Sequence, residues 1–226
     1  TALATATAAP FNVNFFCHTP PRPDTEREAR WRDALAPAYR EAGIDPATIP
    51  AGPGRAPFSH EVADVVEPFR PAVVSFHFGL PAPDLLARVK GWGSKVLASA
   101  TTVAEARWLE AHGADAVIAQ GVEAGGHRGN FLVDEMSTQL GSFALWPLVA
   151  KAVQLPVIAA GGIADAACVR AAHELGVAGE QVGTAYLLCD EALISPLHRA
   201  ALKTDAPTVL TNVFTGRPAR GIVNRV

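Results

Sequence analysis

The sequence has little charge and no long apolar run, and each absence excludes a class of protein. Only 18% of the 226 residues are charged, and 19 Lys and Arg against 22 Asp and Glu give a net charge of −3. Such a balance gives no electrostatic attraction for nucleic acid or for an anionic membrane. No apolar stretch approaches the roughly 20 residues that a membrane-spanning helix needs. We therefore expect neither nucleic acid nor a membrane as a partner.

Cysteine is scarce, and the motifs of several enzyme classes are missing. Cys17, Cys168 and Cys189 are odd in number and widely separated, and they form no C-x-x-C pair. Neither a disulfide framework nor a zinc ribbon is expected, and a reducing, cytoplasmic location fits this usage best. The sequence also lacks G-x-G-x-x-G, the Walker A loop and H-E-x-x-H. A Rossmann NAD site, an ATPase and a metal centre are therefore disfavoured.

Apolar residues are plentiful, and they fall in short runs that alternate with amphipathic segments. They make up 49% of the chain, which is enough to bury a substantial core. The pattern predicts strands at residues 11–16, 72–78, 95–99, 115–119, 156–160 and 181–185. It predicts helices at residues 25–42, 60–68, 83–92, 103–112, 143–153, 165–175 and 191–203. Thr25-x-x-Glu28 and Thr102-x-x-Glu105 are typical of capping boxes.

Alternating strands and helices predict an α/β fold around a parallel sheet. Several of the strands are continuous apolar runs, as expected for strands that are covered on both faces. Two architectures remain open at this point, an open doubly wound sheet and a (β/α)₈ barrel. A complete barrel needs eight strands and roughly 250 residues, so six units fit either an open sheet or a barrel from which strands are missing.

In both architectures the functional site lies at the carboxyl ends of the strands. His18, His77 and His127 lie at or just beyond expected strand ends, whereas the other four histidines fall in expected helices. The most informative segment is the loop Ala119–Gly129, with the sequence AQGVEAGGHRG. Its glycines allow the backbone to approach a flat ligand closely.

Two further segments suit a phosphate group. Ala159–Ile163 (AAGGI) joins a strand to a helix, so its backbone N–H groups can face an anion. Gln181–Thr184 (QVGT) places a glycine and a hydroxyl at the end of the next expected strand. Late adjacent strands of this kind form the usual phosphate pocket of barrel enzymes.

Together these motifs resemble a known family. AQGVEAGGHRG, PVIAAGGI and QVGTA, in this order and spacing, are similar to the nitronate monooxygenases, formerly called 2-nitropropane dioxygenases. FNVNFFCH and VVSFHFG resemble strands of the same family, so the resemblance covers essentially the whole chain. It implies that residues 1–226 form one FMN-binding domain of the TIM (β/α)₈-barrel type with about six βα units. Family members are normally longer at both ends, so the first two strands and a C-terminal helical part are expected to be missing.

The resemblance also implies roles for individual residues. It makes His127 the catalytic histidine beside the flavin and places Asn14 near the flavin. It implies that FMN is bound by Gln120, Gly125, Gly162, Gln181, Val182, Gly183 and Thr184. His77 is a second candidate for the substrate pocket. Arg128 either attracts an anion or faces solvent, and Cys17 and His18 receive no role.

The family's reaction oxidises alkyl nitronates with FMN and O₂ to a carbonyl compound and nitrite, with nitroalkanes as a further candidate substrate. His127, whose imidazole has an ordinary pKa of about 6.5, then acts either as a base toward a neutral nitroalkane or as a cation that stabilises the nitronate. One alternative is an FMN-dependent enoyl-acyl-carrier-protein reductase of the same superfamily. The other is a barrel fragment that binds a phosphate ligand without catalysis. The oligomeric state stays open.

Overall fold

The computed structural model describes residues 5–49 and 54–225. The chain forms two compact units, which we describe separately. Unit 1 comprises residues 1–18 and 58–226, and it contains every residue to which a site role was assigned. Unit 2 comprises residues 19–57.

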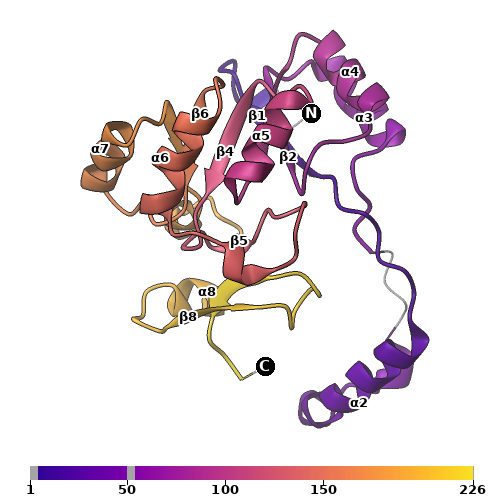
Figure 1. Cartoon of the computed structure of the whole chain (residues 1–226). Helices are drawn as coiled ribbons and strands as arrows, with labels where there is room; N and C mark the ends of the chain where they lie inside the picture. Colours follow the sequence, from indigo (N-terminus) through magenta and orange to yellow (C-terminus); the bar gives the residue numbers. More distant parts are fainter. Residues whose placement is uncertain (1–4, 50–53, 226) are drawn as a thin grey trace. The chain divides into compact units, whose positions relative to one another are not determined.

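Unit 1 is built around a six-stranded parallel sheet with the order β1-β2-β3-β4-β6-β7 (Figure 1). Its strands are β1 (Asn12–Phe16), β2 (Val73–His77), β3 (Lys95–Ala100), β4 (Ala116–Gln120), β6 (Val157–Ala160) and β7 (Gly179–Gln181). The order follows the sequence without reversal, whereas a doubly wound sheet reverses direction at a switch point. The strand order therefore decides between the two open architectures in favour of the barrel type, and it confirms the expected α/β fold.

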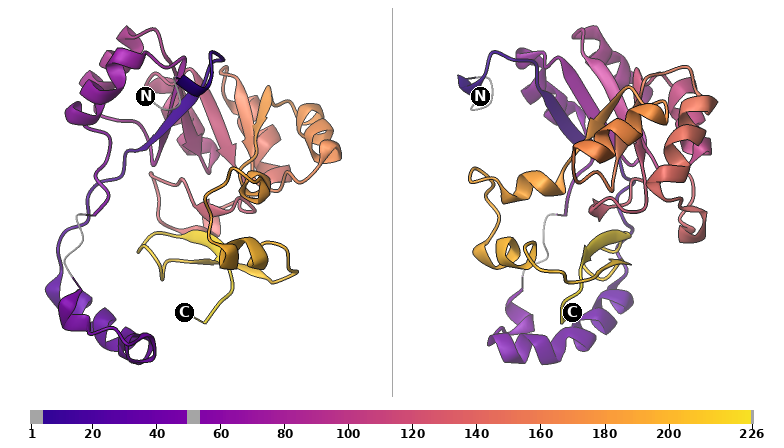
Figure 2. Two further views of the ribbon diagram at one scale, coloured as in Figure 1. Left: turned by 180° about the vertical axis from the view of Figure 1, so that it is seen from behind. Right: turned by 90° about the vertical axis from the view of Figure 1, so that its left-hand side faces the viewer.

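Helices cover one face of this sheet (Figures 1 and 2). They are α3 (His60–Val66), α4 (Pro83–Gly91), α5 (Val103–Ala111), α6 (Ser142–Ala152) and α7 (Ala166–Glu174). Right-handed crossovers between neighbouring parallel strands place successive helices on the same side. Among the described residues, no helix is long and apolar enough to cross a bilayer.

The hydrophobic core fills the layer between the sheet and these helices. Alternate strand residues such as Val74, Phe76 and Val117 point into this layer and are fully buried. They pack with helix residues such as Leu109 and Leu145. The other alternate residues of each strand face the opposite side of the sheet, because strand side chains alternate with a period of two.

A second, three-stranded antiparallel sheet was not expected from the sequence. It pairs β5 (Gly126–His127), inside the glycine-rich loop, with β9 (Ala219–Ile222), which also pairs with β8 (Thr208–Thr211). Figure 1 shows this sheet beside the loop that follows β4. The carboxyl-terminal hairpin thus holds the segment that carries His127.

Three local predictions were wrong. The strand expected at residues 181–185 lies earlier, because the register pairs Ile158 with Gly179, and residues 184–188 form a 3₁₀ turn instead. The helix expected at residues 191–203 is only α8 (Pro196–Ala201). The cap of the first long helix is Asp24 and not Thr25, because the Asp24 carboxylate accepts the N–H of Arg27 at 2.9 Å.

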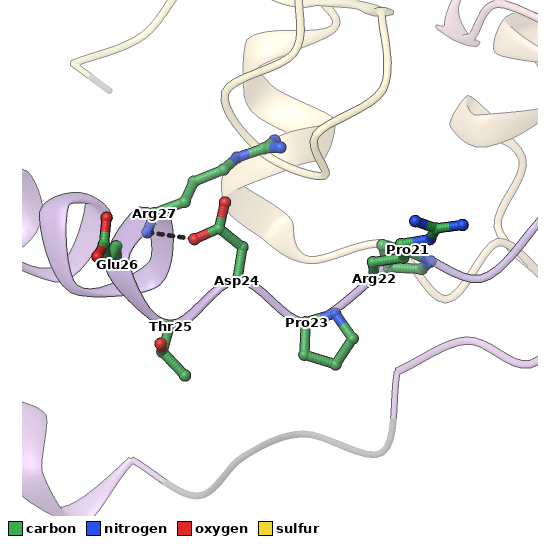
Figure 3. Close-up of a pocket in the computed structure, with 7 residues that line it drawn as sticks. All are labelled: Pro21, Arg22, Pro23, Asp24, Thr25, Glu26 and Arg27. Carbon is green, nitrogen blue, oxygen red and sulfur yellow. Dashed lines mark hydrogen bonds between the residues drawn. The ribbon is translucent and has the colours of Figure 1, made fainter.

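Unit 2 consists mainly of the helix α2 (Thr25–Ala42), which has the predicted bounds and ends at Gly43 in the left-handed conformation. No residue of α2 is buried. Figure 3 shows a hollow at its amino-terminal end, lined by residues 21–27. This hollow contains none of the residues to which a role was assigned.

Candidate functional site

The face of the six-stranded sheet away from the helices carries a row of polar side chains near the carboxyl ends of the strands. The row consists of Asn14, Ser75, His77, Ser99, Gln120 and Gln181. Strand pairing sets neighbours side by side, since Asn14 lies opposite Ser75, and both Gln120 and Gln181 lie opposite Ala160. Ser75 links the first strands by donating to Asn14 Oδ1 at 2.8 Å. Four of the predicted site residues therefore share one surface.

The three histidines predicted at strand ends gather in an aromatic cluster with Phe16 and Phe78. The Phe78 ring centroid lies 4.5 Å from that of His77, 6.0 Å from that of His127 and 6.1 Å from that of His18. Phe78 has φ of +70°, a conformation that is strained for a bulky residue and is found preferentially at functional sites. The cluster supplies a partly apolar wall beside the polar row. In the described part of the chain, no three His, Cys, Asp or Glu side chains group as metal ligands.

His77 is held as a neutral ring. Its Nε2 faces the backbone carbonyl of His127 at 3.3 Å, and a carbonyl can only accept, so Nε2 carries the proton. Its Nδ1 then accepts from the hydroxyl of Ser99 at 3.0 Å. Burial lowers the pKa of His77 to about 4, although the bond to His127 opposes this shift. With both nitrogens engaged, His77 positions the segment that contains His127.

The depressed pKa of His77 predicts a pH-dependent stability. As the pH falls below 6.5, His77 becomes protonated in the unfolded chain, whereas in the folded chain it becomes protonated only near pH 4. The free energy of unfolding therefore falls as the pH is lowered from 6.5 to about 4. At about 1.4 kcal/mol per pH unit, the loss amounts to about 3 kcal/mol. His77→Gln, which cannot titrate, is expected to lack this component when unfolding by urea is measured between pH 7 and pH 4. Parallel curves for the two proteins would contradict the assignment, because the carboxylates titrate in both.

His127 is fixed by its backbone and by a partner that the sequence did not reveal. Its carbonyl accepts the side-chain amide of Gln120 at 3.0 Å, and its backbone pairs with Ala219 of β9. Its ring nitrogen Nε2 lies 2.8 Å from the hydroxyl of Thr215. Because the loop is anchored through backbone groups, the half-buried imidazole is placed by the fold and not by its own side-chain contacts alone.

Gln120 organises the glycine-rich loop from its buried position at the end of β4. Its Nε2 donates to the carbonyl of His127 and its Oε1 accepts the N–H of Gly129 at 2.8 Å. Gly129 must be small, because a Cβ at this position would lie 2.8 Å from Cε1 of His77. Gln120 was predicted as a flavin contact, and these hydrogen bonds show that it also supports the loop.

Of the two alternatives for Arg128, the solvent-facing one was wrong, since the side chain is fully buried. Its N–H donors are directed to groups of the protein itself. Its Nη2 donates to the carbonyl of Gln120 at 2.7 Å, and its Nε donates to Gln139 Oε1 at 3.0 Å. Burial lowers its pKa to about 10, so the guanidinium remains charged at neutral pH. Its partners are backbone oxygens and a neutral amide, which a sequence pattern cannot identify.

A buried carboxylate continues this network. Glu105, fully buried at the start of α5, accepts the N–H and hydroxyl of Thr101 at 2.7 and 2.8 Å and the N–H of Phe131 at 2.7 Å. The expected capping box is therefore only half formed, because Thr102 accepts from Glu105 N while the Glu105 carboxylate binds elsewhere. Gln139 donates to Thr101 at 2.9 Å and so joins the carboxylate to Arg128. The network fixes the loop on both sides of His127.

Three segments after β4, β6 and β7 meet in a backbone cradle. A Cβ on Gly125 would lie 2.9 Å from Thr184 Oγ1, and a Cβ on Gly161 would lie 2.8 Å from the backbone N of Ala124. Gly162 has φ of +71°, which favours glycine, and open space surrounds the Cβ position of Gly183. Glycines thus leave backbone exposed where the sequence predicted a phosphate. The residues present fit that expectation for FMN, since small residues and N–H groups are what a phosphate cradle requires.

The structure also brings residues to this site that the sequence analysis overlooked. Thr215 contacts the His127 ring, Ser99 contacts the His77 ring, and Arg217 lies over Phe78 with Cζ 4.3 Å from the ring centroid. Thr215 and Arg217 belong to the segment before β9, which resembled a simple basic turn. Only the pairing of β5 with β9 brings that segment to the site.

Comparisons with known proteins agree with one another. A family model described as nitronate monooxygenase matches residues 1–226. The nitronate monooxygenase of Pseudomonas aeruginosa is 45% identical over 226 residues, covering 97% of this chain and 64% of that protein. That of Paraburkholderia phytofirmans is 43% identical over 233 residues, covering 96% of this chain and 60% of that protein.

Solved structures give the same picture. The nitroalkane oxidase from Streptomyces ansochromogenes superposes with a TM-score of 0.88 at 38% identity, covering 99% of this chain and 64% of that chain. FabK from Thermotoga maritima superposes with a TM-score of 0.69 at 29% identity, covering 98% of this chain and 57% of that chain. The chain thus spans somewhat less than two thirds of the length of these proteins.

Proposed function

The chain belongs to the nitronate monooxygenase family, and from this premise we propose that it forms the FMN-binding barrel domain of an enzyme that oxidises alkyl nitronates. The reaction consumes O₂ and yields a carbonyl compound and nitrite. One observation carries the proposal. His127, held by β5 against the carboxyl edge of the sheet, lies in the same aromatic cluster as His77 and beside a loop that leads into the glycine cradle.

The cradle is the part of the site that we propose binds the phosphate of FMN. Gly125, Gly162 and Gln181–Thr184 would hold it through backbone N–H groups and the hydroxyl of Thr184. Asn14 and Gln120 would lie along the flavin ring on the polar face of the sheet. FMN, when bound, supplies the acceptor for the electrons that leave the substrate.

The residues of the chain then have three tasks. His127 takes the α-proton of a neutral nitroalkane, or as a cation it stabilises the oxygens of a nitronate. Thr215 fixes the orientation of the imidazole through its contact with Nε2. The rings of Phe16 and Phe78 exclude water from the wall beside His127, which strengthens the electrostatic interactions there.

The activity is tested with protein that has been loaded with FMN and equilibrated with air. We expect nitrite and a carbonyl compound from an alkyl nitronate, with one O₂ consumed per turnover. Consumption of NADPH with an enoyl thioester, without nitrite from the nitronate, would instead support a reductase. Failure to bind any flavin would support a non-catalytic barrel that binds a phosphate ligand.

The position of the phosphate is tested at Gly162. Gly162→Val is expected to lower FMN affinity by roughly tenfold or more, about 1.4 kcal/mol, because valine at positive φ distorts the cradle. Gly43→Val is a matched control, since Gly43 has φ of +67° but lies in unit 2. Flavin fluorescence titration measures both variants. Equal flavin affinity in Gly162→Val and the original protein would show that the phosphate binds elsewhere.

We propose a cytoplasmic location from the cysteine usage.

Burial raises the pKa of the Cys17 thiol to about 12, so this residue stays protonated and takes no part in the proposed chemistry.

A further inference from the structure

We propose that Arg217 is the anion-binding residue of this site and that it holds the planar N–O group of the nitronate beside His127. The inference rests on the proposed function and deepens it, because it assigns to the anionic substrate a permanent cation, which is needed most when His127 acts as a neutral base. The sequence offered Arg128 for this task, but Arg128 is buried and engaged with backbone carbonyls.

Arg217 lies on the segment that leads into the strand paired with His127. Arg217 lies two residues before Ala219, the residue of β9 that pairs with His127. The carbonyl of the next residue, Pro218, accepts the backbone N–H of Arg128 at 2.9 Å, which fixes the turn against the glycine-rich loop. The segment that carries Arg217 also carries Thr215, the partner of the His127 ring. Arg217 and His127 are therefore held by the same pair of strands.

The side chain of Arg217 packs on the aromatic cluster that contains His127. The guanidinium of Arg217 lies over the ring of Phe78, with Cζ 4.3 Å from the ring centroid. That same ring lies within 6.0 Å of the His127 ring, centroid to centroid. Burial is the main cause of the lowered pKa of His77, and the charges of His127, Arg128 and, least of the three, Arg217 lower this pKa further. Both the guanidinium of Arg217 and the His127 ring therefore contact Phe78, and Arg217 is half-buried.

The Arg217 guanidinium has unused hydrogen-bonding capacity. Within the described residues it makes a long hydrogen bond, from Nη1 to the carbonyl of Asn130 at 3.5 Å, and no carboxylate lies within ion-pair distance of it. A guanidinium has five N–H donors. By contrast, Arg220 on the same hairpin donates to the carbonyl of Val122 at 2.9 Å and to the hydroxyl of Thr208 at 3.1 Å. Arg220 is a structural residue, and Arg217 keeps donors for a ligand.

The chemistry of the ligand fits this arrangement. A nitronate is planar and carries its negative charge on two oxygens, as a carboxylate does. The guanidinium fork matches such a pair of oxygens with two parallel hydrogen bonds, whereas an ammonium offers only a point charge. When the substrate arrives as a neutral nitroalkane, loss of its α-proton to His127 creates this anion next to Arg217.

The test compares Arg217→Met, Arg217→Gln and Arg217→Lys in FMN-loaded protein. We expect KM for an alkyl nitronate to rise about 10- to 100-fold in Arg217→Met and Arg217→Gln, with kcat changed less than about threefold. Arg217→Lys keeps the charge without the fork and should restore part of the affinity. Arg170→Met, which removes an exposed arginine from α7, controls for the change in net charge and should behave as the original protein.

A second readout does not depend on turnover. Inorganic nitrate is a planar, unreactive oxyanion, and its binding is followed by the change in flavin absorbance. We expect nitrate to bind the original protein and to bind Arg217→Met and Arg217→Gln at least tenfold more weakly. This result would support Arg217 even if no nitrite were formed, so failure of the proposed function can be distinguished from failure of this inference. Unchanged KM and nitrate affinity would overturn the inference, and so would a loss of FMN affinity in Arg217→Gln with unchanged anion binding.

Discussion

His127→Asn is expected to lower nitroalkane turnover by about 10²- to 10⁴-fold while the protein keeps its bound FMN. Asparagine cannot accept and carry a proton at neutral pH, so a base would be lost. The surrounding fold should persist, because the backbone carbonyl of His127 receives the bonds from Gln120 and His77, and its pairing with β9 is also a backbone interaction. The measurement is nitrite release from a nitroalkane, with flavin content determined in the same sample.

Turnover of the preformed nitronate distinguishes the two roles of His127. If His127 acts only as a base, the variant should oxidise the nitronate at a rate close to that of the original protein, since the proton has already left. If His127 also stabilises the anion as a cation, nitronate turnover should fall as well. A variant that retains full activity toward the nitroalkane would contradict both roles.

Arg128→Met is expected to lower the free energy of unfolding by about 3–5 kcal/mol. The substitution removes a buried cation together with its hydrogen bonds to the carbonyl of Gln120 and the Oε1 atom of Gln139. The carbonyl of Gly121 loses the Arg128 donor but still accepts the backbone N–H of Ala124 at 3.1 Å. A buried acceptor without a partner costs about 1–3 kcal/mol, so several such losses account for this magnitude. Arg128→Lys should recover only part of it, because one ammonium cannot reach partners arranged around a planar fork.

The measurement is urea unfolding of both variants at neutral pH. Arg107→Met is a matched control, because it removes an exposed arginine from α5, and its effect should stay within about 0.5 kcal/mol. A loss below about 1 kcal/mol in Arg128→Met would show that the network from Glu105 to Arg128 contributes little to stability.

Local patterns predicted the parts of the fold that local physics determines. The apolar runs gave the six parallel strands, and α2 has the predicted bounds Thr25–Ala42 because its start and its glycine stop are encoded within a few residues. The end of β7 was misplaced, since pairing with β6 and not the β-branched residues of QVGTA decides where that strand stops. The β5–β9 pairing joins segments about 90 residues apart, and no short-range sequence pattern predicts it.

Local patterns also predicted part of the site, whereas contacts between distant segments were missed. The position of each histidine relative to an expected strand end was sufficient to select His18, His77 and His127, which the structure places around Phe78. Burial of a charge was not predictable, because Arg128 is stabilised by carbonyl oxygens that every residue possesses. Arg217 and Thr215 reach the site only through the hairpin that carries them.

The central claim is that FMN binds the polar face of the six-stranded sheet with its phosphate in the glycine cradle. A crystal structure of the protein soaked with FMN tests it most directly. We expect density for the phosphate beside Gly162 and Gln181–Thr184, and density for the flavin ring on the face that carries Asn14 and within contact of His127. Flavin bound on the helix-covered side, or away from both the cradle and His127, would contradict this binding site.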